Sequence, residues 1–125
     1  MTRYDPLQSP EPHEWLELDE LERIDLVSAY HKRVRAKLPN LRLHATIHAV
    51  IENQLAEGLQ VVQETLHRLM SEGLDRHDAI HAIGSVLAQH MQELMMREAP
   101  TADPNEPYYR DLEALTADDW LEGSQ

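Results

Sequence analysis

Apolar residues recur every three or four positions through most of this chain, which is the spacing of amphipathic α-helices. We expect four long helices, in residues 15–38, 41–56, 60–71 and 76–99. Gly58 and Gly73 follow the second and third of these segments, and glycine commonly ends a helix because it tolerates a left-handed backbone. Asp75 offers a side-chain acceptor to the first amides of the fourth. The pattern therefore predicts helices joined by short connections.

Short connections favour antiparallel packing of consecutive helices. Because the chain has 4 Gly, no Phe and 5% aromatic residues, its composition also favours helices over sheets. We therefore expect an all-α fold with a four-helix antiparallel, bundle-like core in residues 15–100. Residues 1–14 contain three prolines and are expected to form a flexible arm. Residues 101–125 form the expected acidic tail, which has the pattern for one short helix.

The 125 residues carry a net charge of −12, from 23 acidic and 11 basic side chains. This charge is unfavourable near phosphate backbones or anionic membranes, so we expect neither nucleic acid nor a membrane as partner. The absence of cysteine excludes disulfides, thiolate metal ligands and thiol catalysis. A secretory signal needs a basic patch and an apolar core, but this region contains Asp5, Pro6, Pro10, Glu11 and Pro12 instead. The expected location is the cytoplasm.

Six of the 8 histidines are expected to gather at one end of the predicted bundle. An up-down-up-down path brings together the end of the first helix, the start of the second, the end of the third and the start of the fourth. The histidines in those turns are His31, His44, His48, His67, His77 and His81. Only His13 and His90 fall elsewhere.

Within this group, two pairs have a four-residue spacing that suits a shared metal ion. On a helix, such pairs project from one face with Cβ atoms about 6 Å apart. The first pair also shares the apolar stripe of its helix and so points inward. Imidazole binds divalent transition metals, of which we expect zinc or iron. The candidate ligands are His44, His48, His77 and His81, with Glu52 or His31 as a supplementary ligand.

Two other interpretations fit the same end of the predicted bundle. The histidines can be structural, partly buried and bonded to helix ends. Alternatively, helix N-termini and guanidinium groups can hold a phosphate or a carboxylate. Seven of the 11 basic residues lie in these turns: Lys32, Arg33, Arg35, Lys37, Arg42, Arg68 and Arg76.

A further alternative is a non-enzymatic interaction module. An apolar helix face, or Leu112, Leu115 and Trp120 of the tail, would then form a homodimer or hold another protein. The HExxH, GxGxxG, GxSxG and P-loop motifs are missing, so proteases of the zincin type, nucleotide-binding folds and serine hydrolases lack support. Because nothing defines a substrate, the sequence favours a protein that is not an enzyme.

Three blocks of the sequence resemble a bacterial family of small all-helical proteins of unknown function. They are EWLELDELERIDLVSAYH, HATIHAVIENQLA and RLMSEGLDRHDAIHAIGSVLA. These blocks cover most of residues 14–88 and neither the arm nor the tail. The resemblance implies an all-helical cytosolic protein and supplies no activity and no catalytic residue.

Overall fold

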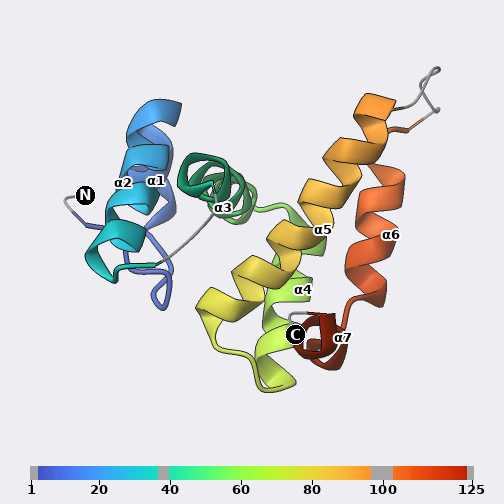
Figure 1. Ribbon diagram of the computed structural model, residues 1–125. Coiled ribbons are helices and arrows are strands. Elements are labelled where there is room, and N and C mark those ends of the chain that lie inside the picture. Colours follow the sequence, from blue (N-terminus) through green and yellow to red (C-terminus); the bar gives the residue numbers. More distant parts are fainter. Residues whose placement is uncertain (1–2, 37–39, 97–102, 124–125) are drawn as a thin grey trace. The chain divides into compact units, whose positions relative to one another are not determined.

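The computed structural model describes residues 3–36, 40–96 and 103–123. Within these ranges the chain forms seven helices and no strand, so the predicted all-α class is confirmed. The chain divides into two compact units, Met1–Leu59 and Gln60–Gln125, whereas we expected one core in residues 15–100. The helices are α1 (Pro12–Glu17), α2 (Glu20–Arg33) and α3 (Leu41–Ala56) in the first unit, and α4 (Gln60–Ser71), α5 (Arg76–Met96), α6 (Glu106–Ala114) and α7 (Ala117–Gly123) in the second (Figure 1).

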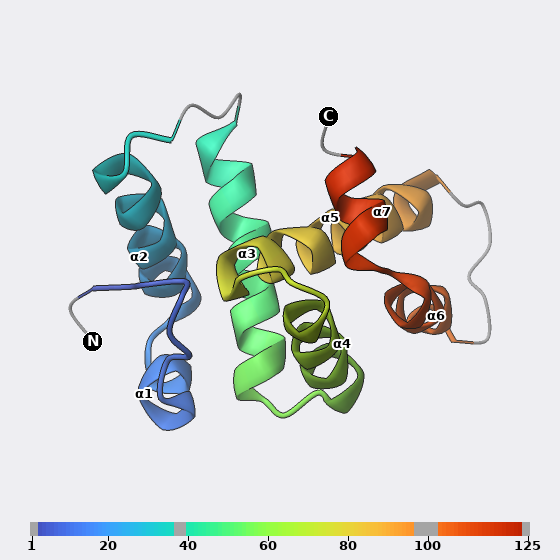
Figure 2. The same cartoon turned by 90° about the horizontal axis from the view of Figure 1, so that it is seen from below.

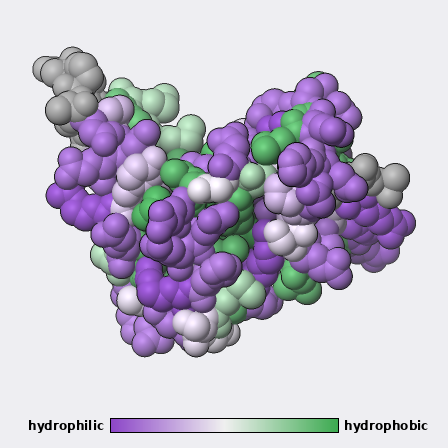
Figure 3. Space-filling model, turned by 180° about the vertical axis from the view of Figure 1, so that it is seen from behind, coloured by the Kyte–Doolittle hydropathy of each residue, from purple (hydrophilic) through white to green (hydrophobic). Residues whose placement is uncertain are grey.

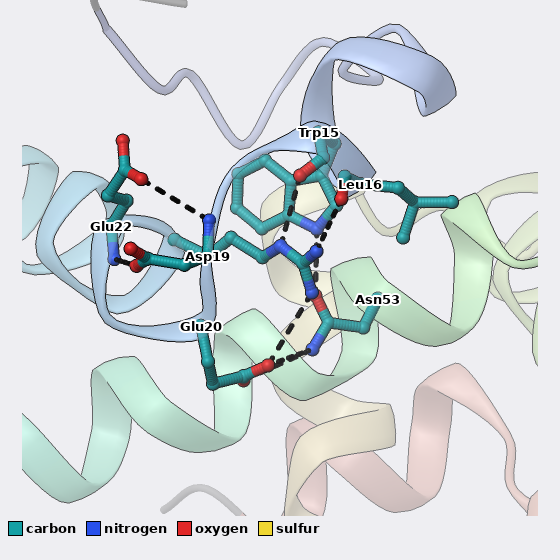
Figure 4. Close-up of polar contacts among 7 residues, drawn as sticks. Trp15, Leu16, Asp19, Glu20, Glu22 and Asn53 are labelled. Carbon is teal, nitrogen blue, oxygen red and sulfur yellow. Dashed lines mark hydrogen bonds and ion pairs between the residues drawn. The ribbon is translucent and has the colours of Figure 1, made fainter.

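The first predicted helix is two helices in the structure. Leu18 has an extended backbone and separates α1 from α2. Asp19 then starts α2 with a capping box: its side chain accepts the Glu22 amide at 2.8 Å, and the Glu22 carboxylate accepts the Asp19 amide (Figure 4). The apolar spacing continues across this junction, so periodicity alone predicted a single helix.

We expected residues 1–14 to form a flexible arm, but the described part of this segment is packed against the rest of the first unit. Tyr4 is fully buried, and α1 already begins at Pro12. Proline suits the first turn of a helix because no partner is needed for its missing amide. Glu11 caps this helix by accepting the Glu14 amide at 2.8 Å. The described part of the segment therefore belongs to the core of the first unit.

α1 and α2 both pack on α3 (Figure 2). The centre of this packing is a cluster of fully buried apolar and aromatic residues, namely Tyr4, Trp15, Val27, Ala45 and Ala49. The two alanines of α3 let the neighbouring helix come close, since they carry no bulk beyond Cβ. This close approach brings the polar side chains of α2 and α3 within reach of one another.

Arg23 of α2 forms hydrogen bonds with the C-terminal end of α1. Its guanidinium donates to the carbonyl oxygens of Trp15 at 3.0 Å and Leu16 at 2.8 Å, in the last turn of the helix, where carbonyls lack the usual amide partner one turn later. The Trp15 oxygen also accepts the Leu18 amide at 3.2 Å. The guanidinium also lies 3.3 Å from Asn53 Oδ1, and that same oxygen accepts the indole N–H of Trp15 at 2.9 Å (Figure 4). One arginine thus joins all three helices of the first unit.

The end of α2 carries a non-glycine residue in the left-handed region. Arg35 has φ 57°, and the amide of Ala36 bonds the carbonyl oxygen of His31 at 2.9 Å. This is the position where glycine usually ends a helix. The predicted end of the first helix, at residue 38, lies outside the described residues.

The bounds predicted for α3 and α4 are confirmed. The Asn40 side chain caps α3 by accepting the Leu43 amide at 3.0 Å. Gly58 and Gly73 follow the two helices with φ +80° and +112°, a backbone that side chains rarely tolerate. The predicted cap of α5 is also present, since Asp75 accepts the Asp78 amide at 2.8 Å. The predicted end of this helix, at residue 99, lies outside the described residues.

In the second unit, α6 packs against both α4 and α5 (Figure 1). Arg68 of α4 donates to the carbonyl oxygens of Leu112 and Leu115 at the end of α6, and Glu72 accepts the Ala117 amide that begins α7. Leu112 is fully buried, so this tail residue faces the unit's own core rather than a partner. We expected one short helix in the tail, and the structure forms two, α6 and α7, because the extended backbone of Leu115 interrupts the helical pattern.

The surface is mainly hydrophilic on the face drawn in Figure 3, with smaller hydrophobic areas between. Among the helices that the structure describes, none combines the length and apolar character needed to cross a lipid bilayer. Among the residues that the structure describes, the most exposed large apolar side chains are Met95 and Met96 at the end of α5.

Candidate metal centre

Three histidines of the first unit converge between α2 and α3. The potential ligand nitrogens of His31, His44 and His48 lie within 4.8 Å of one another. The ring centroid of His31 is 4.7 Å from that of His44 and 5.4 Å from that of His48. His31 and His48 are each 2% exposed, and His44 is partly buried. The structure therefore brings together three of the predicted ligands.

Helical spacing explains this convergence. His44 and His48 are one turn apart on α3, and Ala45 and Ala49, which follow them in sequence, lie in the core beside Val27 of α2. His31 follows Val27 by one turn on α2, so the same packed face presents all three imidazoles.

A backbone carbonyl fixes the proton of His31. Its Nδ1 lies 2.8 Å from the carbonyl oxygen of Val27, one turn earlier in α2. A carbonyl oxygen only accepts hydrogen bonds, so Nδ1 must carry the proton. In the neutral ring, Nε2 then carries the lone pair. A backbone carbonyl is a common second partner of metal-binding histidines, because it holds the ring in one orientation.

His48 is bonded on its other side to a tyrosine and a glutamate. The Tyr4 hydroxyl lies 2.7 Å from His48 Nε2 and donates a hydrogen bond to Glu52 Oε2. We call Glu52, Tyr4 and His48 the buried relay, since all three are at most 2% exposed. Glu52, which we predicted as a supplementary ligand, is thus bonded to Tyr4 in the structure.

Tyr4 is the site residue that sequence reasoning missed. Its ring lies 5.7 Å from Trp15 and edge-on to His48 at 5.4 Å, both between centroids. Its carbonyl oxygen accepts from Arg33 at 3.0 Å. The only local signal was an isolated aromatic residue among prolines, which does not indicate its partners 44 and 48 positions away.

The other predicted histidines have different surroundings. His77 and His81 lie on α5 in the second unit, with ring centroids 4.1 Å apart. That they share one ion with His44 and His48 stays a prediction. His67 is exposed on α4, and His90 is buried and stacked on a tyrosine of α6.

Several of the basic residues expected at this end have protein partners. Arg42 forms an ion pair with Asp25 at 2.8 Å, Arg33 donates to Tyr4, and Arg68 donates to the end of α6. These three guanidinium groups therefore already have acceptors within the protein.

Comparison of the chain with protein-family models, curated proteins and solved structures found no match. The resemblance to the small bacterial helical family therefore stays a prediction, and the site is interpreted from its own geometry.

Proposed function

We propose that this protein binds a divalent transition metal through His31, His44 and His48. The observation that carries the proposal is the convergence of their ligand nitrogens to within 4.8 Å in a largely buried setting. In a tetrahedral zinc site, Zn–N distances of about 2.0–2.1 Å separate neighbouring nitrogens by about 3.4 Å. Small ring rotations would close the difference, and the fixed rings of His31 and His48 limit the entropy lost on binding.

The donor set supports a particular class of metal. Imidazole nitrogen suits zinc, iron, copper and nickel, whereas magnesium and calcium prefer oxygen ligands. Zinc or iron is the expected ion. Because Glu52 is bonded to Tyr4, the proposed inner set is formed by imidazoles alone.

The first test is the metal content of untagged protein purified without chelator, followed by calorimetric titration with zinc. We expect about one equivalent for the wild type and loss of this binding in His48→Ala, with the helical circular dichroism spectrum retained. His13→Ala is the matched control, because the His13 side chain is 94% exposed on α1. A wild type without bound metal, and without a thermal shift on adding zinc, iron, nickel or copper, would refute the proposal.

The same titration examines the two histidines of α5. If His77 and His81 take part as the sequence predicts, His77→Ala and His81→Ala will weaken zinc binding. Unchanged binding in both variants would restrict the site to the three histidines of the first unit.

A homodimer or another protein partner stays a second, non-enzymatic candidate. The observation in its favour is the exposed methionine cluster of α5, formed by Met91, Met95 and Met96. Light scattering of the purified chain distinguishes a monomer from a dimer.

A further inference from the structure

The buried relay bonds one of the three imidazoles, that of His48, to Tyr4 and through it to Glu52. We propose that Tyr4 and Glu52 are positioning residues that hold His48 with its proton on Nε2. His48 would then bind the metal through Nδ1, whereas His31 would bind through Nε2. This inference rests on the proposed metal binding and specifies which atom of each ring performs it.

Counting protons along the relay gives this assignment. A hydroxyl carries a single proton, and Tyr4 donates its proton to Glu52. The Tyr4 oxygen can then only accept from His48, so the 2.7 Å contact requires a proton on Nε2. In the neutral imidazole, the lone pair is therefore on Nδ1.

Burial stabilises this arrangement of protons in the relay. Tyr4, His48 and Glu52 are each at most 2% exposed, so bulk water does not compete for their hydrogen bonds. Reversing the relay would leave the Glu52 carboxylate without the Tyr4 proton, and a buried carboxylate that loses a donor is unfavourable. The carboxylate thus sets the direction of both bonds.

The relay also strengthens His48 as a ligand. A hydrogen bond from the distal ring nitrogen to an acceptor that is itself bonded to a carboxylate makes the metal-binding nitrogen more basic. Because Tyr4 belongs to the N-terminal segment, metal affinity is coupled to the packing of that segment against α1 and α3.

The first test needs no metal. Long-range proton–nitrogen correlation spectra of the metal-free wild type report which ring nitrogen of His48 carries the proton. We expect protonated Nε2 in His48 and protonated Nδ1 in His31. A proton on Nδ1 of neutral His48 would overturn the inference even if the protein binds zinc.

The second test measures zinc affinity and its pH dependence in relay variants. Tyr4→Phe keeps the ring and removes the acceptor of Nε2, so we expect affinity to fall by about 10- to 100-fold. Glu52→Leu removes the acceptor of the tyrosine proton, which then turns to His48 Nε2 and leaves the ring proton on Nδ1. We expect the same or greater loss for this variant.

Two matched variants separate the relay from general effects. Glu52→Gln keeps an oxygen acceptor for Tyr4 and is expected to retain the His48 tautomer and most of the affinity. Tyr109→Phe removes the hydroxyl of a partly buried tyrosine of α6 in the second unit and is expected to change neither the tautomer nor the affinity.

The outcomes distinguish this inference from the proposed function. A wild type that binds no zinc refutes the proposed function. The tautomer of its metal-free His48 still tests whether the relay holds the proton on Nε2. If the wild type binds zinc and both Tyr4→Phe and Glu52→Leu bind it equally tightly, the relay has no role in binding. If either variant fails to fold, the wild-type spectrum decides.

Discussion

In the first unit, the space between the N-terminal segment, α2 and α3 holds Tyr4, His31, His48 and Glu52, all almost fully buried. In the second unit, α4, α5 and α6 bury mainly aliphatic side chains such as Leu69, Ile83 and Leu112. Buried polar groups stabilise a fold less than apolar groups of similar volume, even when they are bonded. The second unit also buries polar side chains, namely Thr65, Arg76 and His90. The first unit differs because its buried polar side chains contact one another, as Tyr4 does with His48 and Glu52.

Each unit contains an arginine that donates hydrogen bonds to the carbonyl oxygens at the C-terminal end of a short helix. Arg23 bonds the last carbonyls of α1, and Arg68 bonds those of α6. The arginine side chain is 12% exposed in the first unit and 35% exposed in the second. This arginine contact is thus common to both units, and the difference between the units lies in their buried cores.

The largest expected effect is in the apolar core of the second unit. Leu112→Ala removes a fully buried side chain from α6 and should lower the free energy of unfolding by about 2–5 kcal/mol. Urea denaturation measures this loss, and zinc affinity should be unchanged. Met95→Ala, at a side chain that is 85% exposed, is the control and should change stability by less than about 0.5 kcal/mol. A small loss for Leu112→Ala would mean that α6 contributes little to the unit.

A smaller effect is expected from the two arginines. Arg23→Met keeps an apolar stem and removes charged donors from two carbonyls, so we expect a loss of about 1.5–3 kcal/mol. Arg68→Met should cost less, because solvent screens and replaces its more exposed contacts. Urea denaturation of both variants gives the order. A greater loss for Arg68→Met would reverse this part of the comparison.

The smallest effect concerns the exposed cap of α1. The Glu14 amide, followed by His13, holds the pKa of Glu11 below its ordinary value of 4.5. A lowered pKa in the folded state stabilises the fold above the unfolded value and loses this contribution as pH falls through the folded value. Glu11→Gln should therefore slightly lower the melting temperature near about pH 7, and this difference should shrink as the pH falls below 4.5.

The control for this prediction is Glu113→Gln, at an exposed position of α6 in the second unit. We expect no pH-dependent difference between this variant and the wild type. A difference for Glu11→Gln that persists in acid would show that the cap does not act through its charge.

Local signals predicted the fold better than the site. Asn40 and Gly58 stand at the ends of α3, so its bounds could be predicted from capping residues and apolar spacing. The inward direction of His44 and His48 followed from the same spacing. The split between α1 and α2 was missed although Asp19 and Glu22 carry a capping-box signature.

The relay could not be predicted, because its partners are remote in sequence. Glu52 was recognised one turn beyond His48, but nothing near Tyr4 indicates a contact with either residue. Proline content pointed instead to a flexible arm. Only the packing of Tyr4 beside Trp15 and α3 shows where this hydroxyl lies.

The distance along the chain between Tyr4 and Glu52 has a consequence for how the first unit forms. At synthesis rates of about 5–20 residues per second, the 48 positions between them take about 2–10 s to add. Contacts between α2 and α3 close shorter loops and are expected to form more readily than the remote contact of Tyr4. We therefore expect the histidines of these two helices to meet before Tyr4 bonds one of them.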